Sequence, residues 1–218
     1  EDTASNILKD FILYEYIDSV TVIDESISLS YVDALKLFEY QTLYKNGYDL
    51  SDTATVLDAK SDTIISNAGT ITATVTDGED LTSLDLQNID KISIDAYETV
   101  TLSASQATKV TKVTKDGDYN VVDTSTNILE NLEVNQFIVM RATTVTTSDN
   151  TELVLAHDQI YSSGVTITNG YSMYDTAQNI SSIHTDEAVL TQARDVTVTV
   201  ADGDDLTGLD LQHVDTIE

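Results

Sequence analysis

Acidic residues that recur at matching positions of a repeated segment are the groups in this sequence whose type and spacing could do chemistry. The segment DGEDLTSLDLQNIDKI, which begins at Asp77, returns from Asp202 as DGDDLTGLDLQHVDTI. Each copy places carboxylates close to a glycine; these are Asp77, Glu79, Asp80 and Asp85 in the first copy, and Asp202, Asp204, Asp205 and Asp210 in the second. Closely spaced hard oxygen ligands beside a flexible glycine are what a calcium ion requires. The sequence therefore predicts calcium as a cofactor of these two segments.

A purely structural interpretation of the two acidic segments competes with the calcium site. They are not EF-hands, because the twelfth residue from Asp202 is His213, where that loop needs a bidentate glutamate. Aspartate and glycine are also the residues of tight turns, and an aspartate can cap the DLTSLDL segment. Both interpretations stay open at the level of the sequence.

Other reactive groups are sparse, and we expect no enzyme activity. The three histidines, His157, His184 and His213, stand singly, without a second ligand at metal-binding spacing. Cysteine is absent, which excludes thiol nucleophiles and disulfides. The sequence contains no GxSxG nucleophile motif and no phosphate-binding glycine loop. Carboxylates are too abundant to single out a catalytic pair, so an acidic hydrolase from a salt-loving organism is the weakest alternative.

The charge balance restricts the partners of the chain. Its 38 acidic residues outnumber 10 basic ones, which gives a net charge of −28. Such a chain cannot neutralise phosphates, so we expect no nucleic-acid partner, and anionic membrane surfaces are disfavoured for the same reason. No apolar stretch is long enough to cross a bilayer, so we expect no membrane insertion. Cations or high ionic strength would offset the self-repulsion, which favours an extracellular location.

A short motif divides the chain into repeats. The pattern Asp-Thr-small-x-Asn/Val-aliphatic occurs as DTASNI at Asp2, DTATVL at Asp52, DTSTNI at Asp123 and DTAQNI at Asp175. The acidic segment follows only the second and fourth copies, so short and long half-repeats alternate. We therefore divide the chain into a repeat pair at 1–122, with half-repeats 2–51 and 52–122, and a second pair at 123–218, with half-repeats 123–174 and 175–218. Because the last half-repeat is incomplete, we expect the chain to be part of a longer array.

Each half-repeat has the pattern of short helices and strands. We expect the motif aspartate to cap a short helix, whose apolar stripe in the first copy is Ala4, Ile7, Leu8 and Phe11. Alternating β-branched residues then predict strands with one buried face, joined by Asp-rich hairpin or corner turns. Ser103 and Gln106 fit a capping box for a second short helix. The chain returns through a strand that contains a tyrosine, expected in the core or at a strand edge; the tyrosines are Tyr48, Tyr119 and Tyr171.

The expected fold is mixed α/β. One half-repeat with this order of elements cannot bury its helices and its strands alone, so neighbours must share a core. We therefore expect tandem half-repeats of short helix, strands, short helix and strand. They would be stacked as a β-rich array that is either solenoid-like or beaded.

The motifs resemble those of a known class of repeat. The DTAxNI helix start, the tyrosine strand in YDLSDTA from Tyr48 and the segment VTLSASQA from Val100 are similar to the tandem repeats of very large bacterial surface proteins. In those giant adhesins and surface-layer-like proteins, SDTAANL and LTAAQ strings alternate. The resemblance implies an extracellular, secreted protein that serves as a stalk, coat or filament and often responds to calcium.

Together these features predict a non-catalytic structural segment of a large extracellular bacterial repeat protein. It would form a surface layer, a filament or an adhesin stalk by self-association, so its partners would be further copies of itself. The alternative is a calcium-dependent module that binds a ligand such as a glycan or a cell-surface polysaccharide.

Overall fold

The computed structural model contains short helices and short parallel strands. It describes residues 3–9, 21–23, 27–39, 43–44, 46–95, 97, 99–113, 118–139, 141–160, 165–183, 187–202, 205–207 and 212–218. The chain forms two compact units, which we call unit 1 (Glu1–Glu98 and Lys109–Gly117) and unit 2 (Thr99–Thr108 and Asp118–Glu218). The division of the sequence into repeat pairs at 1–122 and 123–218 stays a prediction.

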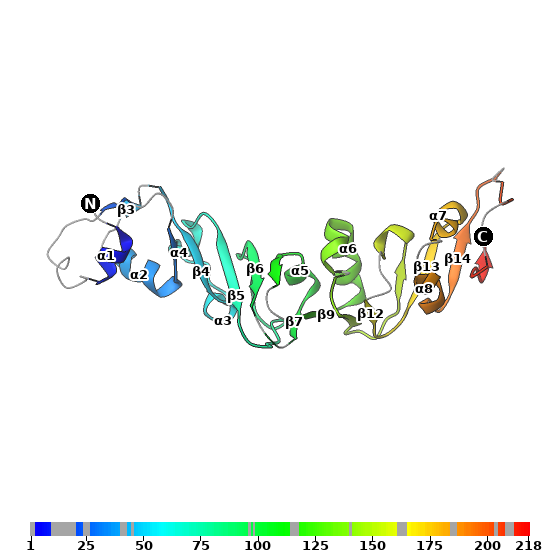
Figure 1. Cartoon of the computed structure of the whole chain (residues 1–218), viewed down its shortest axis with the longest axis horizontal. Coiled ribbons are helices and arrows are strands. Elements are labelled where there is room, and N and C mark those ends of the chain that lie inside the picture. Colours follow the sequence, from blue (N-terminus) through cyan, green and yellow to red (C-terminus); the bar gives the residue numbers. More distant parts are fainter. Residues whose placement is uncertain are drawn as a thin grey trace. The chain divides into compact units, whose positions relative to one another are not determined.

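In its described residues, unit 1 contains a two-stranded and a five-stranded sheet, with four short helices. Its helices are α1 (Ala4–Lys9), α2 (Tyr31–Glu39), α3 (Ala54–Leu57) and α4 (Thr63–Ser66). Its strands are β1 (Thr21–Val22), β2 (Ser28–Leu29), β3 (Leu43–Tyr44), β4 (Asp49–Thr53), β5 (Ile71–Val75), β6 (Lys91–Ile94) and β8 (Val110–Val113). The strand orders are β1-β3 and β2-β4-β5-β6-β8, and Figure 1 shows β4, β5 and β6 side by side.

The part of unit 2 that the structure describes contains two four-stranded sheets. Its helices are α5 (Ala104–Ala107), α6 (Ser125–Val139), the 3-10 helix η2 (His157–Gln159), α7 (Ala177–Ser181) and α8 (Glu187–Gln192). Its strands are β7 (Val100–Leu102), β9 (Tyr119–Asp123), β10 (Thr144–Thr147), β11 (Leu153–Leu155), β12 (Thr166–Ile167), β13 (Tyr171–Thr176), β14 (Val196–Thr199) and β15 (Thr216–Ile217). The strand orders are β12-β10-β9-β7 and β11-β13-β14-β15.

Every strand pairing in the described residues is parallel. Paired residues lie between 18 positions apart, as for Leu153 with Tyr171, and 24 positions apart, as for Asn120 with Thr144. Parallel strands cannot be joined by a hairpin, because the chain must cross over between them. The hairpin turns that the sequence suggested are therefore wrong for these pairs, and helices and loops make the connections instead.

The core of each unit lies between the inward faces of the strands and the short helices. Along β5 the residues alternate, with Ile71, Ala73 and Val75 buried. This confirms the prediction of strands with one buried face. The predicted helical stripe is confirmed at Ala4 and Ile7, which are buried on α1, whereas Leu8 is half-buried and Phe11 lies outside the described residues.

The two serine caps fix where short helices begin. The Ser103 hydroxyl accepts from the backbone N–H of Gln106, and the Gln106 side chain accepts from the backbone N–H of Ser103, which confirms the predicted capping box. At the start of α2 the Ser30 hydroxyl accepts from the Asp33 N–H at 3.1 Å. Among the described residues, no helix has the length and apolar character that crossing a bilayer requires.

Candidate functional site

The aspartate of the DTxxN motif joins two segments that are distant in sequence. Asp123 stands at the end of β9, where its Oδ1 accepts from the N–H of Thr124 at 2.8 Å. Its Oδ2 accepts from the N–H of Ala104, the first residue of α5, at 3.0 Å. The carboxylate therefore ties the end of one strand to the first turn of an earlier helix, whose free N–H groups favour a negative charge.

The same junction occurs at two other copies of the motif. In unit 1, Asp52 accepts from Thr53 at 2.8 Å and from Tyr31, the first residue of α2, at 3.0 Å. In unit 2, Asp175 accepts from Thr176 at 2.6 Å and from His157, the first residue of η2, at 2.8 Å. One short sequence pattern thus builds one connection three times.

The motif threonine, and not the aspartate, caps the helix that follows. Thr53 and Thr176 are the N-cap residues of α3 and α7, with side-chain oxygens that accept from the N–H groups of Val56 and Asn179. The expectation that the aspartate caps its own helix is therefore wrong in these copies, because its carboxylate is directed to the neighbouring segment. In the first copy Thr3 accepts from the Asn6 N–H at 3.3 Å, whereas Asp2 lies outside the described residues.

The motif asparagine completes the junction where it is present. The Asn127 side-chain amide donates to Asp123 at 2.7 Å, and that of Asn179 donates to Asp175 at 2.8 Å. Burial by itself would raise the pKa of Asp175, but the N–H groups of His157 and Thr176 and the Asn179 amide outweigh it and hold the pKa below the ordinary value of 3.8. Asp175 is therefore a charged structural group at neutral pH.

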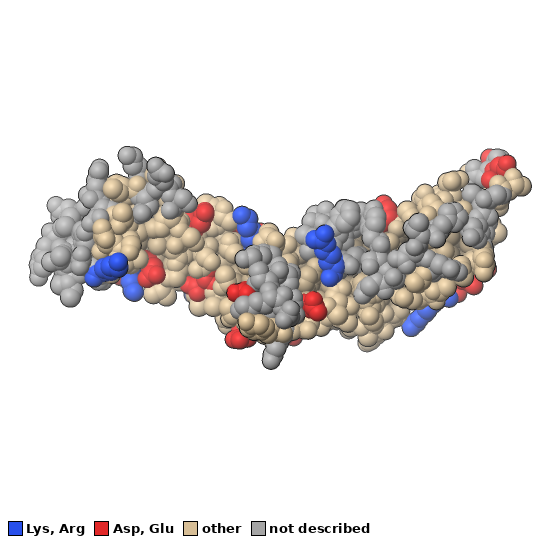
Figure 2. All heavy atoms as spheres, viewed as in Figure 1, with Lys and Arg blue, Asp and Glu red and all other residues tan. Residues whose placement is uncertain are grey.

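Further aspartates bind backbone N–H groups of an earlier segment. Asp90 accepts from Ile71 at 2.8 Å, and Asp215 accepts from Val196 at 2.9 Å. Asp149 accepts from the N–H and the hydroxyl of Ser125. Sequence reasoning missed these three, although Asp90 and Asp215 occupy equivalent positions in the two acidic segments. On the face drawn in Figure 2, the coloured acidic side chains are scattered among uncharged ones and do not form a single patch.

The predicted calcium residues form matching turns in the two copies. Asp80 Oδ1 accepts from the N–H and hydroxyl of Thr82 at 3.0 and 2.7 Å, and Asp205 Oδ1 accepts from the same groups of Thr207 at 2.9 and 2.5 Å. In both cases the threonine hydroxyl, followed by its N–H, lowers the pKa of the aspartate. These bonds are those of local turns, as the structural interpretation expects.

The other members of the predicted calcium set are exposed, make a local turn, or lie outside the described residues. Asp77, Glu79 and Asp202 are exposed. Asp85 accepts from the N–H of Gln87 at 3.2 Å. Asp204 and Asp210 lie outside the described residues. Among the described residues, no three His, Cys, Asp or Glu side chains are grouped so that they could hold a metal ion. Calcium binding by these segments stays a prediction.

One histidine lies close to a serine. His157 Nε2 is 3.3 Å from the Ser182 hydroxyl, which also donates to the Asn179 carbonyl at 2.6 Å. The Ser182 N–H is used at the end of α7, so this backbone donor is not available to stabilise an oxyanion. The contact is explained as packing of η2 against a helix end. His184 lies outside the described residues.

The strand tyrosines belong to the core, as the sequence predicts. Tyr48, Tyr119 and Tyr171 are buried. The Tyr48 hydroxyl donates to the Ile64 carbonyl at 2.6 Å, and the Tyr171 hydroxyl donates to the Val189 carbonyl at 2.5 Å. Burial raises the pKa of Tyr119 to about 12. Tyr48 and Tyr171 therefore hold helices onto strands, and all three tyrosines are buried in the core, where they do not offer an exposed ring to a ligand.

Large apolar side chains are exposed in both units, and several of them share one helix of unit 1 or one sheet of unit 2. On α2 they are Val32, Leu35 and Phe38. On the sheet β11-β13-β14-β15 they include Val154 and Tyr174. Exposed apolar groups that cluster on one element mark surfaces for interaction.

Comparison with known proteins gives no relative for this chain. No protein-family model, no curated protein and no solved structure matches it. The resemblance to repeats of bacterial surface proteins rests on the short motifs alone and stays a prediction. Inference about function therefore rests on the junctions and surfaces described above.

Proposed function

We propose that the chain is a non-catalytic structural segment of a large extracellular bacterial repeat protein. In this proposal it builds a surface layer, a filament or an adhesin stalk by self-association. The observation that carries the proposal is the junction at Asp52, Asp123 and Asp175, where the motif aspartate accepts from the N–H of the next threonine and from the first residue of an earlier helix in three of the four copies. Repetition of a connection is what a scaffold needs, whereas a catalytic site is built once.

We further infer a solenoid-like arrangement within each unit. Parallel pairing at separations of 18 to 24 residues supports it, because each turn of the chain then lays its strand beside that of the turn before. The matched pairs Asp80 and Asp205, and Asp90 and Asp215, support the long repeat, because each pair makes equivalent bonds. In such a stack each coil shares its core with its neighbours.

The hydrogen bonds and burial of the motif side chains favour a structural role over a catalytic one. The aspartate, threonine and asparagine of the motif are engaged in hydrogen bonds to backbone or to each other. The small and aliphatic positions are buried, as Ala177 and Ile180 are in the fourth copy. Each recurring feature of the motif is thereby explained by folding.

Self-association is the first prediction of this proposal. We expect the purified chain to form larger species as its concentration rises, measured by sedimentation velocity, with fibres or sheets seen by negative-stain electron microscopy. Far-ultraviolet circular dichroism of the same samples separates assembly of folded chains from aggregation. A folded monomer over the whole soluble concentration range would contradict the proposal.

A calcium-dependent binding module is the second candidate function. It is favoured by the repetition of the acidic turn, in which Asp80 and Asp205 accept in the same way from the hydroxyls of Thr82 and Thr207. Its ligand in that case would be a glycan or a cell-surface polysaccharide.

The response to salts distinguishes the two candidates. A net charge of −28 destabilises the compact state, so we expect sodium chloride to raise the melting temperature by screening. For a purely structural segment, calcium chloride at equal ionic strength should raise it to a similar extent. Saturable heat in a calcium titration, lost in the variant D80A and retained in the variant D195A, would instead favour the calcium-dependent module.

A further inference from the structure

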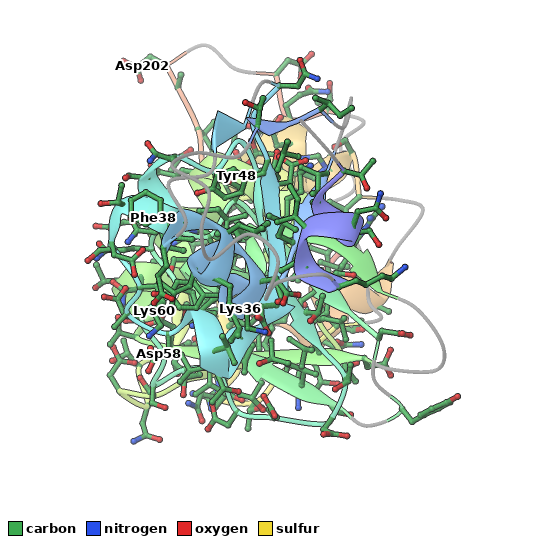
Figure 3. The ribbon with its side chains drawn as sticks, turned by 90° about the vertical axis from the view of Figure 1, so that its left-hand side faces the viewer. Lys36, Phe38, Tyr48, Asp58, Lys60 and Asp202 are labelled. Atoms are coloured by element: carbon green, nitrogen blue, oxygen red, sulfur yellow. The ribbon has the colours of Figure 1, made fainter. Side chains whose placement is uncertain are left out.

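Strand β15 is the counterpart of β6 in the repeated acidic segment. The first copy of the segment begins at Asp77 and ends at Ile92 on β6, and the second begins at Asp202 and ends at Ile217 on β15. Figure 3 shows the side chain of Asp202 pointing away from the ribbon. Each strand pairs on one side with the strand that precedes its segment, β6 with β5 and β15 with β14. The two strands can therefore be compared position by position.

The two strands differ in what lies on their second side. The strand order β2-β4-β5-β6-β8 places β8 beside β6, and Val110 on β8 pairs in register with Ile92. In the described residues, β15 is the last strand of the order β11-β13-β14-β15. Ile92 is 0% exposed, whereas Ile217 is 56% exposed. The first copy therefore shows which kind of neighbour covers this isoleucine.

The outer edge of β15 offers the backbone groups that β6 uses to bind its neighbour. The Ile92 N–H donates to the carbonyl of Lys109, the residue before β8, at 2.8 Å. In the second copy the Glu218 N–H donates to the Val198 carbonyl at 2.9 Å. Because Val198 lies opposite Ile217 in this parallel pair, the N–H and carbonyl of Ile217 are directed away from β14. Such an edge can pair with an added strand.

A lysine accompanies the strand that covers β6. The Lys109 ammonium donates to the carbonyls of Leu86 and Gln87 in the first acidic segment, at 2.8 and 3.1 Å. Burial lowers the pKa of Lys109, while the carboxylates of Asp90 and Asp85 act in the opposite direction. The lysine thus binds the acidic segment at the same time as its strand pairs with β6.

The second copy retains a carboxylate that could face such a lysine. Asp215 occupies the position of Asp90, and it accepts from the N–H of Val196 at 2.9 Å as Asp90 accepts from that of Ile71 at 2.8 Å. Among the described residues, the ion pairs do not include Asp215. A strand that brings a lysine to this edge would therefore meet a complementary charge.

We propose that the outer edge of β15 binds, in parallel, a strand of the β8 type from another polypeptide. A strand of the β8 type is an extended segment in which a lysine precedes Val-Thr-Lys-Val, the sequence of β8. Its carbonyl accepts from the Ile217 N–H, its first valine covers the Ile217 side chain, and its lysine faces Asp215. In an intact second copy β8 is already paired with β6, so the partner is a chain that presents such a strand unpaired. The proposal goes beyond the proposed function by giving the segment a site that receives a strand.

The test uses a synthetic peptide of residues 108–115, which contains β8 and the lysine before it. The chain, labelled with nitrogen-15, is titrated with this peptide and followed by nuclear magnetic resonance of its backbone amides. We expect saturable shifts in β14 and β15 and slower hydrogen exchange of the Ile217 N–H. Shifts confined to β6, where Ile92 binds the chain's own β8, would show strand displacement and would overturn the proposal. Absence of any saturable shift would also overturn it.

Two peptide variants of equal net charge separate strand recognition from general attraction to an acidic chain. Lys109→Glu in the peptide reverses the charge that would face Asp215, whereas Lys115→Glu reverses a charge beyond β8. We expect the Kd of the Lys109→Glu peptide to be higher than that of the Lys115→Glu peptide by about tenfold or more. Equal weakening of both would mean that only the net charge of the peptide matters, against the proposal.

A variant of the chain locates the contact. Ile217→Pro removes the N–H that points away from β14, and proline is tolerated at the open side of an edge strand, so the fold should be kept when checked by circular dichroism. Val154→Ala, at an exposed aliphatic residue on β11, is the control. We expect the peptide to bind the control like the unchanged chain and to lose binding to Ile217→Pro. Binding that survives Ile217→Pro would place the peptide elsewhere and overturn the proposal, whereas self-association, measured without peptide, tests the proposed function separately.

Discussion

Replacing Asp175 by alanine is expected to lower the free energy of unfolding by about 2–4 kcal/mol, because three donors lose a charged acceptor. These donors are the N–H groups of His157 and Thr176 and the side-chain amide of Asn179. The free energy of unfolding of Asp175→Asn should lie between those of the unchanged chain and Asp175→Ala. An amide keeps one acceptor oxygen but turns its NH2 group toward the other donors. Urea unfolding of the three chains at neutral pH measures the series.

The effect of Asp175 should depend on pH. Its pKa in the folded chain is below the ordinary value of 3.8, so its contribution to stability is complete above that value. The contribution is lost as the pH falls through the lower folded pKa, and the difference between the unchanged chain and Asp175→Ala should shrink accordingly.

Asp195→Ala is the matched control for Asp175. Asp195 is exposed and its carboxylate makes no hydrogen bond within the described part of the chain, so its replacement should change stability by less than about 0.5 kcal/mol. Equal effects at positions 175 and 195 would show that the junction does not stabilise the fold.

Replacing Ile128 by alanine is expected to lower the free energy of unfolding by about 2–5 kcal/mol, as for other large-to-small changes in cores. Ile128 is the aliphatic residue of the third motif, lies on α6 and is 0% exposed. The higher helix propensity of alanine offsets only a few tenths of a kcal/mol. Urea unfolding of the unchanged chain and Ile128→Ala measures the net change in the free energy of unfolding.

Hydrogen exchange can locate the effect of Ile128→Ala in the chain. If the aliphatic position holds the core of its unit, exchange should increase across unit 2 and not only in α6. Val154→Ala, at a 54% exposed aliphatic residue of the same unit, is the control and should cost less than about 0.5 kcal/mol. A loss below about 1 kcal/mol at Ile128 would mean that the motif helix does not anchor the core.

Local features could be predicted from the sequence because they depend on neighbouring residues. The capping box of Ser103 and Gln106 is one example, and the alternation along β5 is another. The buried tyrosines followed from the apolar pattern around them. In the capping box and along β5 the residues that form the pattern lie within a few positions, so spacing alone identifies them.

The partners of the carboxylates could not be predicted in the same way. An aspartate before a threonine and a small residue fits an N-cap, and the local pattern gives no sign of an N–H group many positions earlier. At Asp123 that partner is Ala104, brought close only by the parallel pairing of β7 with β9. The expected hairpins failed for the same reason, because strand direction depends on partners that the local pattern does not name.

The sequence by itself therefore determined the mixed α/β composition, the short capped helices, the half-buried strands and the recurrence of one motif. Only the tertiary structure decided which segments become neighbours, and with that whether an acidic side chain is a cap, a turn or a bridge. The physical reason is that caps and periodicity are local properties of the backbone. A carboxylate oxygen, by contrast, accepts a hydrogen bond from any N–H group that the parallel sheets bring within about 3 Å of it, and that group can be distant in sequence.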